Sequence, residues 1–119
     1  MAEEKTAIDS AIEWVKKKGF SKIKAQNVDE FEDTSSFTIS GGSEVVAPEI
    51  TAIRNGRKSY FDIANKEEDK QRLISKWKLY EQLARLKDGS FFIFVPFGLK
   101  AFTERIIKKH NIQAKLVTL

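Results

Sequence analysis

Glu49 and Asp62 flank the strongest turn signal in the sequence, and two carboxylates brought together in this way can bind a divalent cation. Alternating polar and apolar residues connect each acid to Asn55-Gly56. Asn-Gly favours a two-residue type I′ turn, because both central positions of that turn need positive φ. Counting outward from the turn pairs Thr51 with Tyr60 and places the two carboxylates directly opposite each other. Like charges at opposed positions destabilise a pair of strands, so something must offset them.

Three explanations for this pair of acids are open. A Mg²⁺ ion would use both carboxylates, a backbone carbonyl and water, since it prefers hard oxygen ligands. A nearby lysine or arginine would neutralise the acids instead. A shifted register, or fraying at the strand end, would leave Glu49 in solvent. Acid pairs are common on hairpins, so the residue pattern alone favours the last two explanations over a metal.

The pattern around these acids resembles the PD-(D/E)XK nuclease superfamily, which includes restriction endonucleases and archaeal-type Holliday junction resolvases. The resemblance rests on a first helix ending in Gly19-Phe20, on Pro48-Glu49 in one hairpin strand and on Asp62-Ile63-Ala64 in the other. A helix and an apolar strand follow, so the order of elements agrees over essentially the whole chain. The resemblance implies an α/β fold with a restriction-endonuclease-like core, a mixed β-sheet flanked by helices, in the order αβββαβαβ.

The same resemblance implies a set of site residues. In this superfamily two acids and the carbonyl of the residue between acid and lysine bind Mg²⁺, and a lysine positions or activates the attacking water. The corresponding metal ligands here are Glu49, Asp62 and the carbonyl of Ile63, with Mn²⁺ as a substitute cation. Glu13 on the first helix would be an accessory acid.

Position 64 departs from the family pattern, because Ala64 stands where the lysine is expected. Alanine can neither hold a hydroxide nor stabilise charge that develops on a phosphate. Lys66 has the same strand parity but lies two residues further on. Lys76 falls within the apolar arc of the predicted second helix, where some members of the superfamily carry their lysine. The residue pattern alone favours a structural role without catalysis, in which the Lys76 stem lines the apolar face and its ammonium reaches solvent.

The resulting functional hypothesis is a Mg²⁺-dependent DNA endonuclease, a phosphodiester hydrolase, with Glu49, Asp62 and Lys76 as its catalytic residues. Cleavage is expected to be slow or absent, because position 64 lacks an amine. The alternative is a catalytically inactive nuclease-like domain that binds nucleic acid or a protein partner. A third hypothesis is a small interaction domain unrelated to nucleases.

Charge is distributed unevenly along the 119 residues, whose formal net charge is +4. Residues 1–50 contain 6 basic and 10 acidic groups, whereas residues 51–119 contain 15 basic and 7 acidic groups. A positive second half favours a polyanionic partner such as DNA. The expected phosphate contacts are Arg54, Arg57, Lys58 and Lys78, although a solvated surface would contain the same residues. Formation of a homodimer is left open.

The elements that must position these residues follow from hydrophobic periodicity and turn signals, and they describe a single domain over residues 1–119. The 49–54 and 57–64 segments should be antiparallel, and the 91–95 strand should be parallel to the latter because a long helix separates them. We expect helices over about 5–18, 67–88 and 97–109, and strands over about 21–28, 36–40, 48–54, 57–64, 91–95 and 112–119.

Composition excludes several classes of chemistry. The absence of cysteine removes disulfide scaffolds, thiolate zinc sites, iron–sulfur clusters and cysteine nucleophiles. A single histidine, His110, makes a Ser-His-Asp triad improbable. The first residues lack the order of a signal peptide, and the longest apolar run, Phe91 to Val95, is too short to cross a bilayer. We therefore expect a cytoplasmic protein.

Overall fold

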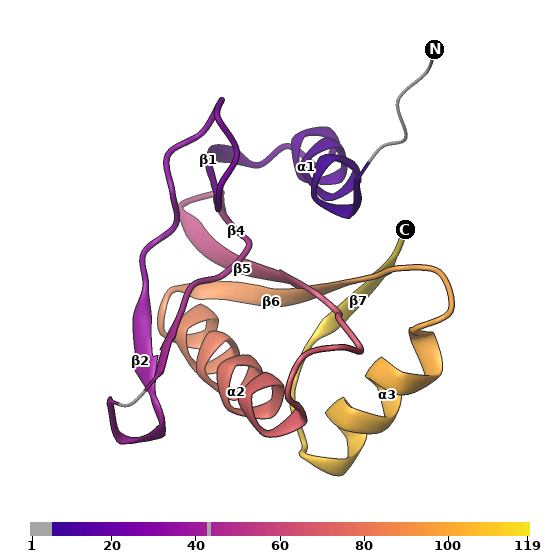
Figure 1. Cartoon of the computed structure of the whole chain (residues 1–119). Helices are drawn as coiled ribbons and strands as arrows, with labels where there is room; N and C mark the ends of the chain where they lie inside the picture. Colours follow the sequence, from indigo (N-terminus) through magenta and orange to yellow (C-terminus); the bar gives the residue numbers. More distant parts are fainter. Residues whose placement is uncertain (1–5, 43) are drawn as a thin grey trace.

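A mixed five-stranded sheet forms the centre of the computed structural model, which describes residues 6–42 and 44–119 (Figure 1). Its strand order is β1-β4-β5-β6-β7. The first three strands are antiparallel neighbours, whereas β5, β6 and β7 are parallel. The strands are β1 (Ser21–Ala25), β4 (Ile50–Arg54), β5 (Arg57–Ile63), β6 (Asp88–Val95) and β7 (Lys115–Thr118).

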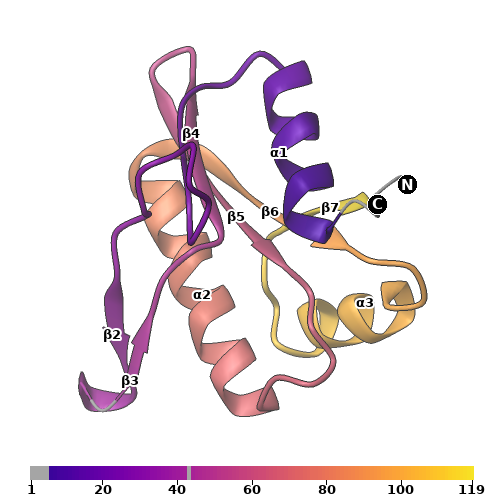
Figure 2. The same cartoon turned by 45° about the horizontal axis from the view of Figure 1, so that its top comes forward.

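Helices cover both faces of this sheet, as Figures 1 and 2 show. Helix α1 (Ala7–Lys17) lies on one face, and α2 (Lys70–Leu86) and α3 (Lys100–Lys109) lie on the other, where they provide the two parallel crossovers. Successive side chains of a strand point to opposite faces. Phe61 therefore packs with the α1-side core, whereas Tyr60 and Ala64 pack with the α2-side core. Asp62 has the same parity as Tyr60 and lies on the α2 face.

The predicted hairpin is confirmed in both its turn and its register. Asn55 and Gly56 have φ values of 56° and 75°, as a type I′ turn requires. Thr51 pairs with Tyr60, and the last pair of the ladder joins Ile50 to Phe61. The next position outward on each strand places Glu49, directly before β4, opposite Asp62.

A second sheet of two strands is the main difference from the sequence prediction. β2 (Phe37–Ile39) and β3 (Glu44–Val46) pair antiparallel beside the main sheet, and the short helix η1 (Ser40–Gly42) lies between them. The predicted 36–40 strand therefore exists but lies outside the main sheet, and β3 was not predicted. The three residues of β3 carry too little periodicity to distinguish a strand from a loop. The expected segments, with 36–40 included, contain four strands before the second helix. When 36–40 and β3 are left out, the main sheet and its helices follow the order αβββαβαβ that the resemblance implies.

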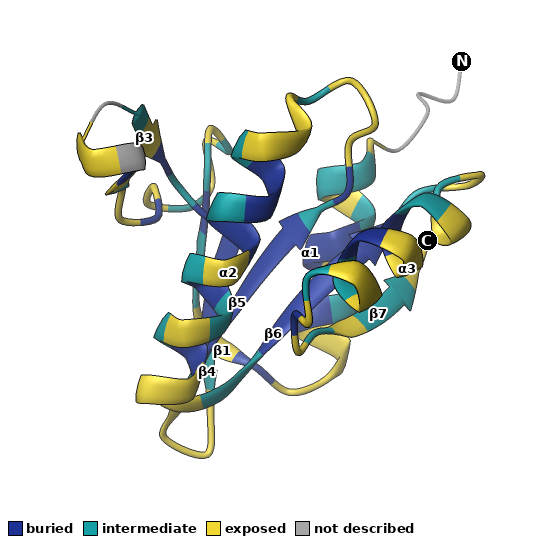
Figure 3. Ribbon diagram, turned by 90° about the horizontal axis from the view of Figure 1, so that it is seen from below, coloured by how far each residue is buried: buried dark blue, intermediate teal, exposed yellow. Residues whose placement is uncertain are grey.

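The ends of several elements also shift. Asp69 caps α2, because its side chain accepts a hydrogen bond of 2.9 Å from the Arg72 N–H, so the helix begins later than predicted. β6 begins at Asp88, three residues before the predicted start. Burial is greatest along β5 and β6, between the layers of helices (Figure 3). Among the described residues, no helix has the length and apolar character needed to cross a membrane.

Candidate functional site

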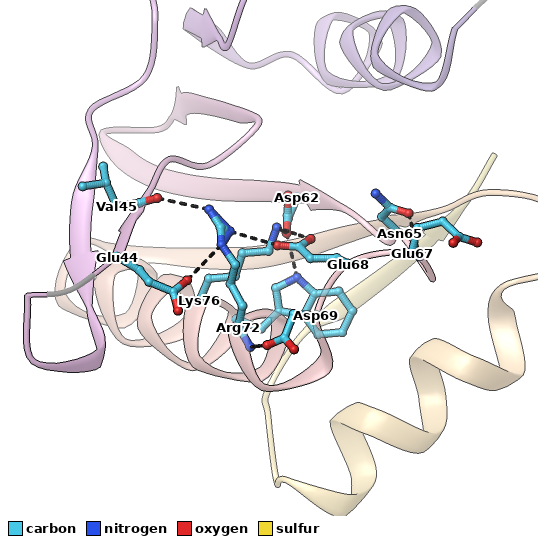
Figure 4. A network of polar contacts seen from close by, with 10 residues as sticks. Glu44, Val45, Asp62, Asn65, Glu67, Glu68, Asp69, Arg72 and Lys76 are labelled. Carbon is cyan, nitrogen blue, oxygen red and sulfur yellow. Dashed lines mark hydrogen bonds and ion pairs between the residues drawn. The ribbon is translucent and has the colours of Figure 1, made fainter.

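Helix α2 directs Lys76 inward onto Asp62 (Figure 4). Lys76 Nζ lies 3.2 Å from Asp62 Oδ2 and 2.7 Å from Glu68 Oε1. The indole Nε1–H of Trp77 donates a 2.7 Å hydrogen bond to the same Asp62 oxygen. Asp62 is 1% exposed and Lys76 is 8% exposed. The preference for an ammonium that reaches solvent is therefore wrong, and a lysine is the group that offsets Asp62.

A second cation fixes the carboxylate that holds Lys76. Arg72 Nη1 lies 3.2 Å from Glu68 Oε2, one helical turn away. The same guanidinium reaches β3, with Nε 3.2 Å from Glu44 Oε2 and Nη2 donating a 3.1 Å hydrogen bond to the Val45 carbonyl. A continuous polar network thus joins the β2–β3 sheet to Asp62. We call Glu49, Asp62, Glu68, Lys76 and Trp77 the acid–lysine centre.

Burial raises the pKa values of two acids in this centre, Glu49 and Asp62. Burial raises the pKa of Glu49, and the nearby Asp62 carboxylate raises it further. Burial also raises the pKa of Asp62, although the Lys76 ammonium and the Trp77 N–H act in the opposite direction. Burial lowers the pKa of Lys76, but the Asp62 and Glu68 carboxylates outweigh it and hold that pKa above its usual value. Three carboxylates therefore surround one protonated lysine, and Arg72 offsets part of the charge of Glu68. Additional negative charge in this centre would be unfavourable.

Tyr80 lies one turn further along α2 and is fully buried. Its hydroxyl has no hydrogen-bond partner among the described residues. Burial raises the pKa of this phenol, and the Asp62 carboxylate raises it further, so the group stays neutral. The ring packs edge-on against Phe91, with 5.9 Å between centroids. Tyr80 is a packing residue, as the sequence indicated, with an unused donor near the acids.

The other residues named from the sequence are not all brought to this centre. Ala64 is 2% exposed and packs in the α2-side core, while Lys66 is exposed in the loop that follows β5. Glu13 is carried by α1, which covers the opposite face of the sheet. The accessory role expected for Glu13 is therefore wrong. Within the described residues, no three His, Cys, Asp or Glu side chains form a group that could hold a metal ion.

The expected phosphate contacts lie at a distance from the acids. Arg54 and Arg57 occupy the hairpin tip, five residues from the acids on β4 and β5, which corresponds to about 16 Å along a strand. The Lys58 ammonium lies 5.5 Å from the centroid of the Tyr60 ring. Lys78 is exposed on α2. Arg54, Arg57 and Lys58 thus form a region at the hairpin tip that is separate from the metal ligands inferred from the sequence, whereas Lys78 belongs to α2.

Sequence reasoning missed Glu68 and Arg72, and it treated Trp77 only as a core residue. Trp77 is indeed fully buried, yet its N–H bonds to Asp62. Glu68 directly precedes the cap of α2, where an acid is explained by the helix dipole alone. The available signal was that Lys76 falls on the apolar arc, because a lysine placed there needs a buried carboxylate partner.

Comparisons with protein-family models, with curated proteins and with solved structures found no match for this chain. The PD-(D/E)XK resemblance therefore remains a hypothesis that rests on the residues of the hairpin and on the order of the elements.

Proposed function

We propose that this chain is a Mg²⁺-dependent nuclease domain of the PD-(D/E)XK type that acts on DNA, with Lys76 in place of the lysine missing at position 64. The observation that carries the proposal is the 3.2 Å contact between Lys76 Nζ and Asp62, on the face where Glu49 opposes Asp62. The αβββαβαβ order of the main sheet and its helices supports a restriction-endonuclease-like core.

The residues present suit a divalent cation by the chemistry of their donors. Glu49 and Asp62 are oxygen donors. Burial, and then repulsion by the Asp62 carboxylate, raise the pKa of Glu49, so a cation between the two acids would relieve an unfavourable interaction. With the Ile63 carbonyl and water molecules, they would hold Mg²⁺ or Mn²⁺. When bound, Mg²⁺ would polarise a phosphate oxygen and lower the pKa of a coordinated water.

Lys76 acts as a charged group in this proposal rather than as a base. Its raised pKa keeps the ammonium protonated at neutral pH. An ammonium has three N–H donors, and Asp62 and Glu68 accept two of them. The third donor is left to stabilise negative charge on a phosphate oxygen. Trp77 holds the Asp62 carboxylate in place, and Arg72 holds Glu68.

Cleavage of supercoiled plasmid DNA, with Mg²⁺ or Mn²⁺, tests the proposal. We expect slow cleavage by the natural chain and a loss of about 10²–10⁴-fold in Lys76→Ala, because removal of a group that acts in the transition state has this effect. Lys76→Met retains the packing of the side-chain stem and should lose activity equally. Lys66→Ala is the matched control and should cleave like the natural chain. Robust cleavage by a Lys66→Ala, Lys76→Ala double variant would show that the site is misplaced.

A catalytically inactive nuclease-like domain is the second candidate. Two observations favour it, because Asp62 is almost fully enclosed and Ala64, at the lysine position, is part of the core. Such a domain would bind nucleic acid or a protein partner without cleaving it.

Titration with Mn²⁺, followed by NMR, separates the two candidates. A nuclease centre should broaden the amide signals of Glu49, Asp62 and Ile63 before others, with about millimolar affinity, and Asp62→Asn should abolish this selectivity. An inactive domain should show no selective broadening. Broadening centred on Asp29 to Asp33 would indicate a generic acidic loop.

A further inference from the structure

A polar hollow lies at the tip of the β4–β5 hairpin, at the opposite end of β5 from Asp62. It encloses about 140 Å³, between the hairpin tip and the first residues of β6 and β7. Ser59 has the parity of Phe61 and faces the α1 side, so the hollow and the acid–lysine centre are on opposite faces of the sheet. The lining residues used below are Arg54, Arg57, Ser59, Asp88, Ser90 and Lys115.

Positive charge dominates this hollow, because three cationic side chains line it and Asp88 is the only acid among its lining residues. Within residues 6–42 and 44–119, neither Arg57 nor Lys115 forms an ion pair with a carboxylate. The Lys115 ammonium instead lies 5.6 Å from the centroid of the Phe92 ring. Two unpaired cations that share one hollow make it a site of positive potential.

Arg54 is held in a fixed orientation. Its Nη1 donates a 2.9 Å hydrogen bond to the Lys18 carbonyl, and its guanidinium carbon lies 4.2 Å from the centroid of the Phe20 ring. A guanidinium has five N–H donors, so the bond to the Lys18 carbonyl leaves donors for a ligand. An arginine that is already ordered loses little conformational entropy when an anion binds.

The wall of the hollow is formed by closely packed backbone. A Cβ atom on Gly89 would lie only 1.8 Å from the Lys58 carbonyl oxygen, so β6 can approach β5 here only with glycine. The register of β5 and β6 shifts at this point. The Ser90 N–H donates a 3.1 Å hydrogen bond to the hydroxyl of Ser59, which is 4% exposed. Such irregularities in a sheet are typical of places where side chains are redirected toward a ligand.

We propose that this hollow binds a phosphomonoester group, with Arg54, Arg57 and Lys115 as its cationic ligands. Arginine suits this chemistry, because its planar fork of donors matches phosphate oxygens, and a dianion would offset the surplus of positive charge. A terminal phosphate of a nucleic-acid strand and a small phosphorylated metabolite present the same group. Binding here requires neither the acid–lysine centre nor a metal ion, so it does not rest on the nuclease activity.

Titration of the ¹⁵N-labelled chain with inorganic phosphate tests the proposal. The solution contains EDTA, and ionic strength is held constant with sodium chloride. We expect amide shifts at Asn55, Gly56, Gly89 and Ser90 at millimolar phosphate. An Arg57→Gln, Lys115→Gln variant should bind roughly 10- to 100-fold more weakly, because hydrogen bonds to charged groups are lost. The matched control Lys108→Gln, Lys109→Gln removes two charges from the end of α3 and should bind normally.

A second set of titrations distinguishes the two sources of phosphate. A short oligonucleotide with a 5′-phosphate is compared with the same oligonucleotide without it, and with a nucleoside monophosphate. Tighter binding of the phosphorylated oligonucleotide than of the monophosphate identifies a strand end, whereas equal binding identifies a small phosphorylated molecule. The proposal is overturned if phosphate causes no shifts at the hairpin tip, or if both double variants bind phosphate equally well.

Discussion

The acid–lysine centre and the hairpin-tip hollow occupy opposite ends of β5, and they differ in how their charges are satisfied. In the centre, Lys76 is buried between two carboxylates, and Trp77 and Arg72 occupy further lone pairs. At the tip, Arg57 and Lys115 are exposed and form no ion pair within the described residues. Burying a charge is costly unless it is paired, whereas a solvated charge costs the fold little. Substitutions in the acid–lysine centre should therefore mainly lower the free energy of unfolding. Substitutions at the hairpin tip should mainly weaken the binding of ligands.

Removal of Lys76 should have the largest effect on stability. Lys76→Ala leaves Asp62 buried without its cation, and breaking a buried ion pair in this way costs about 3–5 kcal/mol in the free energy of unfolding. Urea denaturation followed by circular dichroism measures the loss. Lys78→Ala, on the exposed side of the same helix, is the control and should change stability by no more than about 0.5 kcal/mol. If Lys76→Ala and Lys78→Ala lose the same free energy of unfolding, the buried ion pair stabilises the fold no more than an exposed lysine does.

Trp77→Phe should have the next largest effect on the free energy of unfolding. The substitution keeps an aromatic ring in the core but removes the N–H that binds Asp62 Oδ2 at 2.7 Å. Loss of a hydrogen bond to a buried charged acceptor costs about 1.5–3 kcal/mol. Thermal or urea unfolding measures the change. A Trp14→Phe variant, altered in the α1-side core where the ring packs 5.4 Å from Phe92, is the comparison for loss of indole packing alone. If both variants lose the same stability, the Trp77 hydrogen bond contributes nothing measurable.

The parts of the fold that local chemistry specifies were predictable from the sequence. Asn55-Gly56 defined the turn, and the turn defined the register that opposes Glu49 and Asp62. Apolar periodicity indicated the three helices. β3 and its pairing with β2 were missed because β3 has only three residues. The register shift between β5 and β6 beside Gly89 is visible only in the structure, as a close approach to Lys58.

The partners within the centre were less accessible to sequence reasoning. The position of Lys76 on the apolar arc was evident, but its ion pairs depend on how far α2 slides along β5 when it packs. Glu68 had a sufficient explanation at the helix start, so nothing singled it out. The hollow at the tip joins residues from β4, β5, β6 and β7, and no linear spacing connects Lys115 to Arg57.

Glu49→Gln should change the pH dependence of stability. The folded chain holds the pKa of Glu49 above its ordinary value of 4.5, because of burial and the Asp62 carboxylate. The folded state then binds this proton more tightly than the unfolded state, so ionisation of Glu49 weakens the fold as pH rises above 4.5 and through the raised pKa. The variant should match the natural chain in acid and exceed its stability at neutral pH. Urea denaturation at a series of pH values measures the difference.

If the two acids bind the cation, added Mg²⁺ should stabilise the natural chain at neutral pH. It should thereby reduce the difference in the free energy of unfolding between Glu49→Gln and the natural chain. If the difference in the free energy of unfolding between the two proteins does not vary with pH, the folded state does not raise the pKa of Glu49.

Charge reversal at the hairpin tip should have the smallest effect on stability and a large effect on DNA binding. Arg57→Glu with Lys58→Glu alters an exposed and a half-buried side chain that form no ion pair among the described residues, so stability should change by roughly 0.5 kcal/mol or less. Burial, and then repulsion by Lys24 and Lys87, lower the pKa of Lys58, and reversal of its charge relieves that repulsion. If both residues contact phosphates, each contributes about −0.9 to the slope of log K against log salt, so the slope should become shallower by about 1.8. Fluorescence anisotropy with a labelled duplex, at several salt concentrations, measures the slope.

Lys108→Glu with Lys109→Glu is the control, because it gives the same change in net charge at the end of α3. An equal loss of affinity in that variant would show that DNA binding responds to overall charge rather than to the hairpin tip.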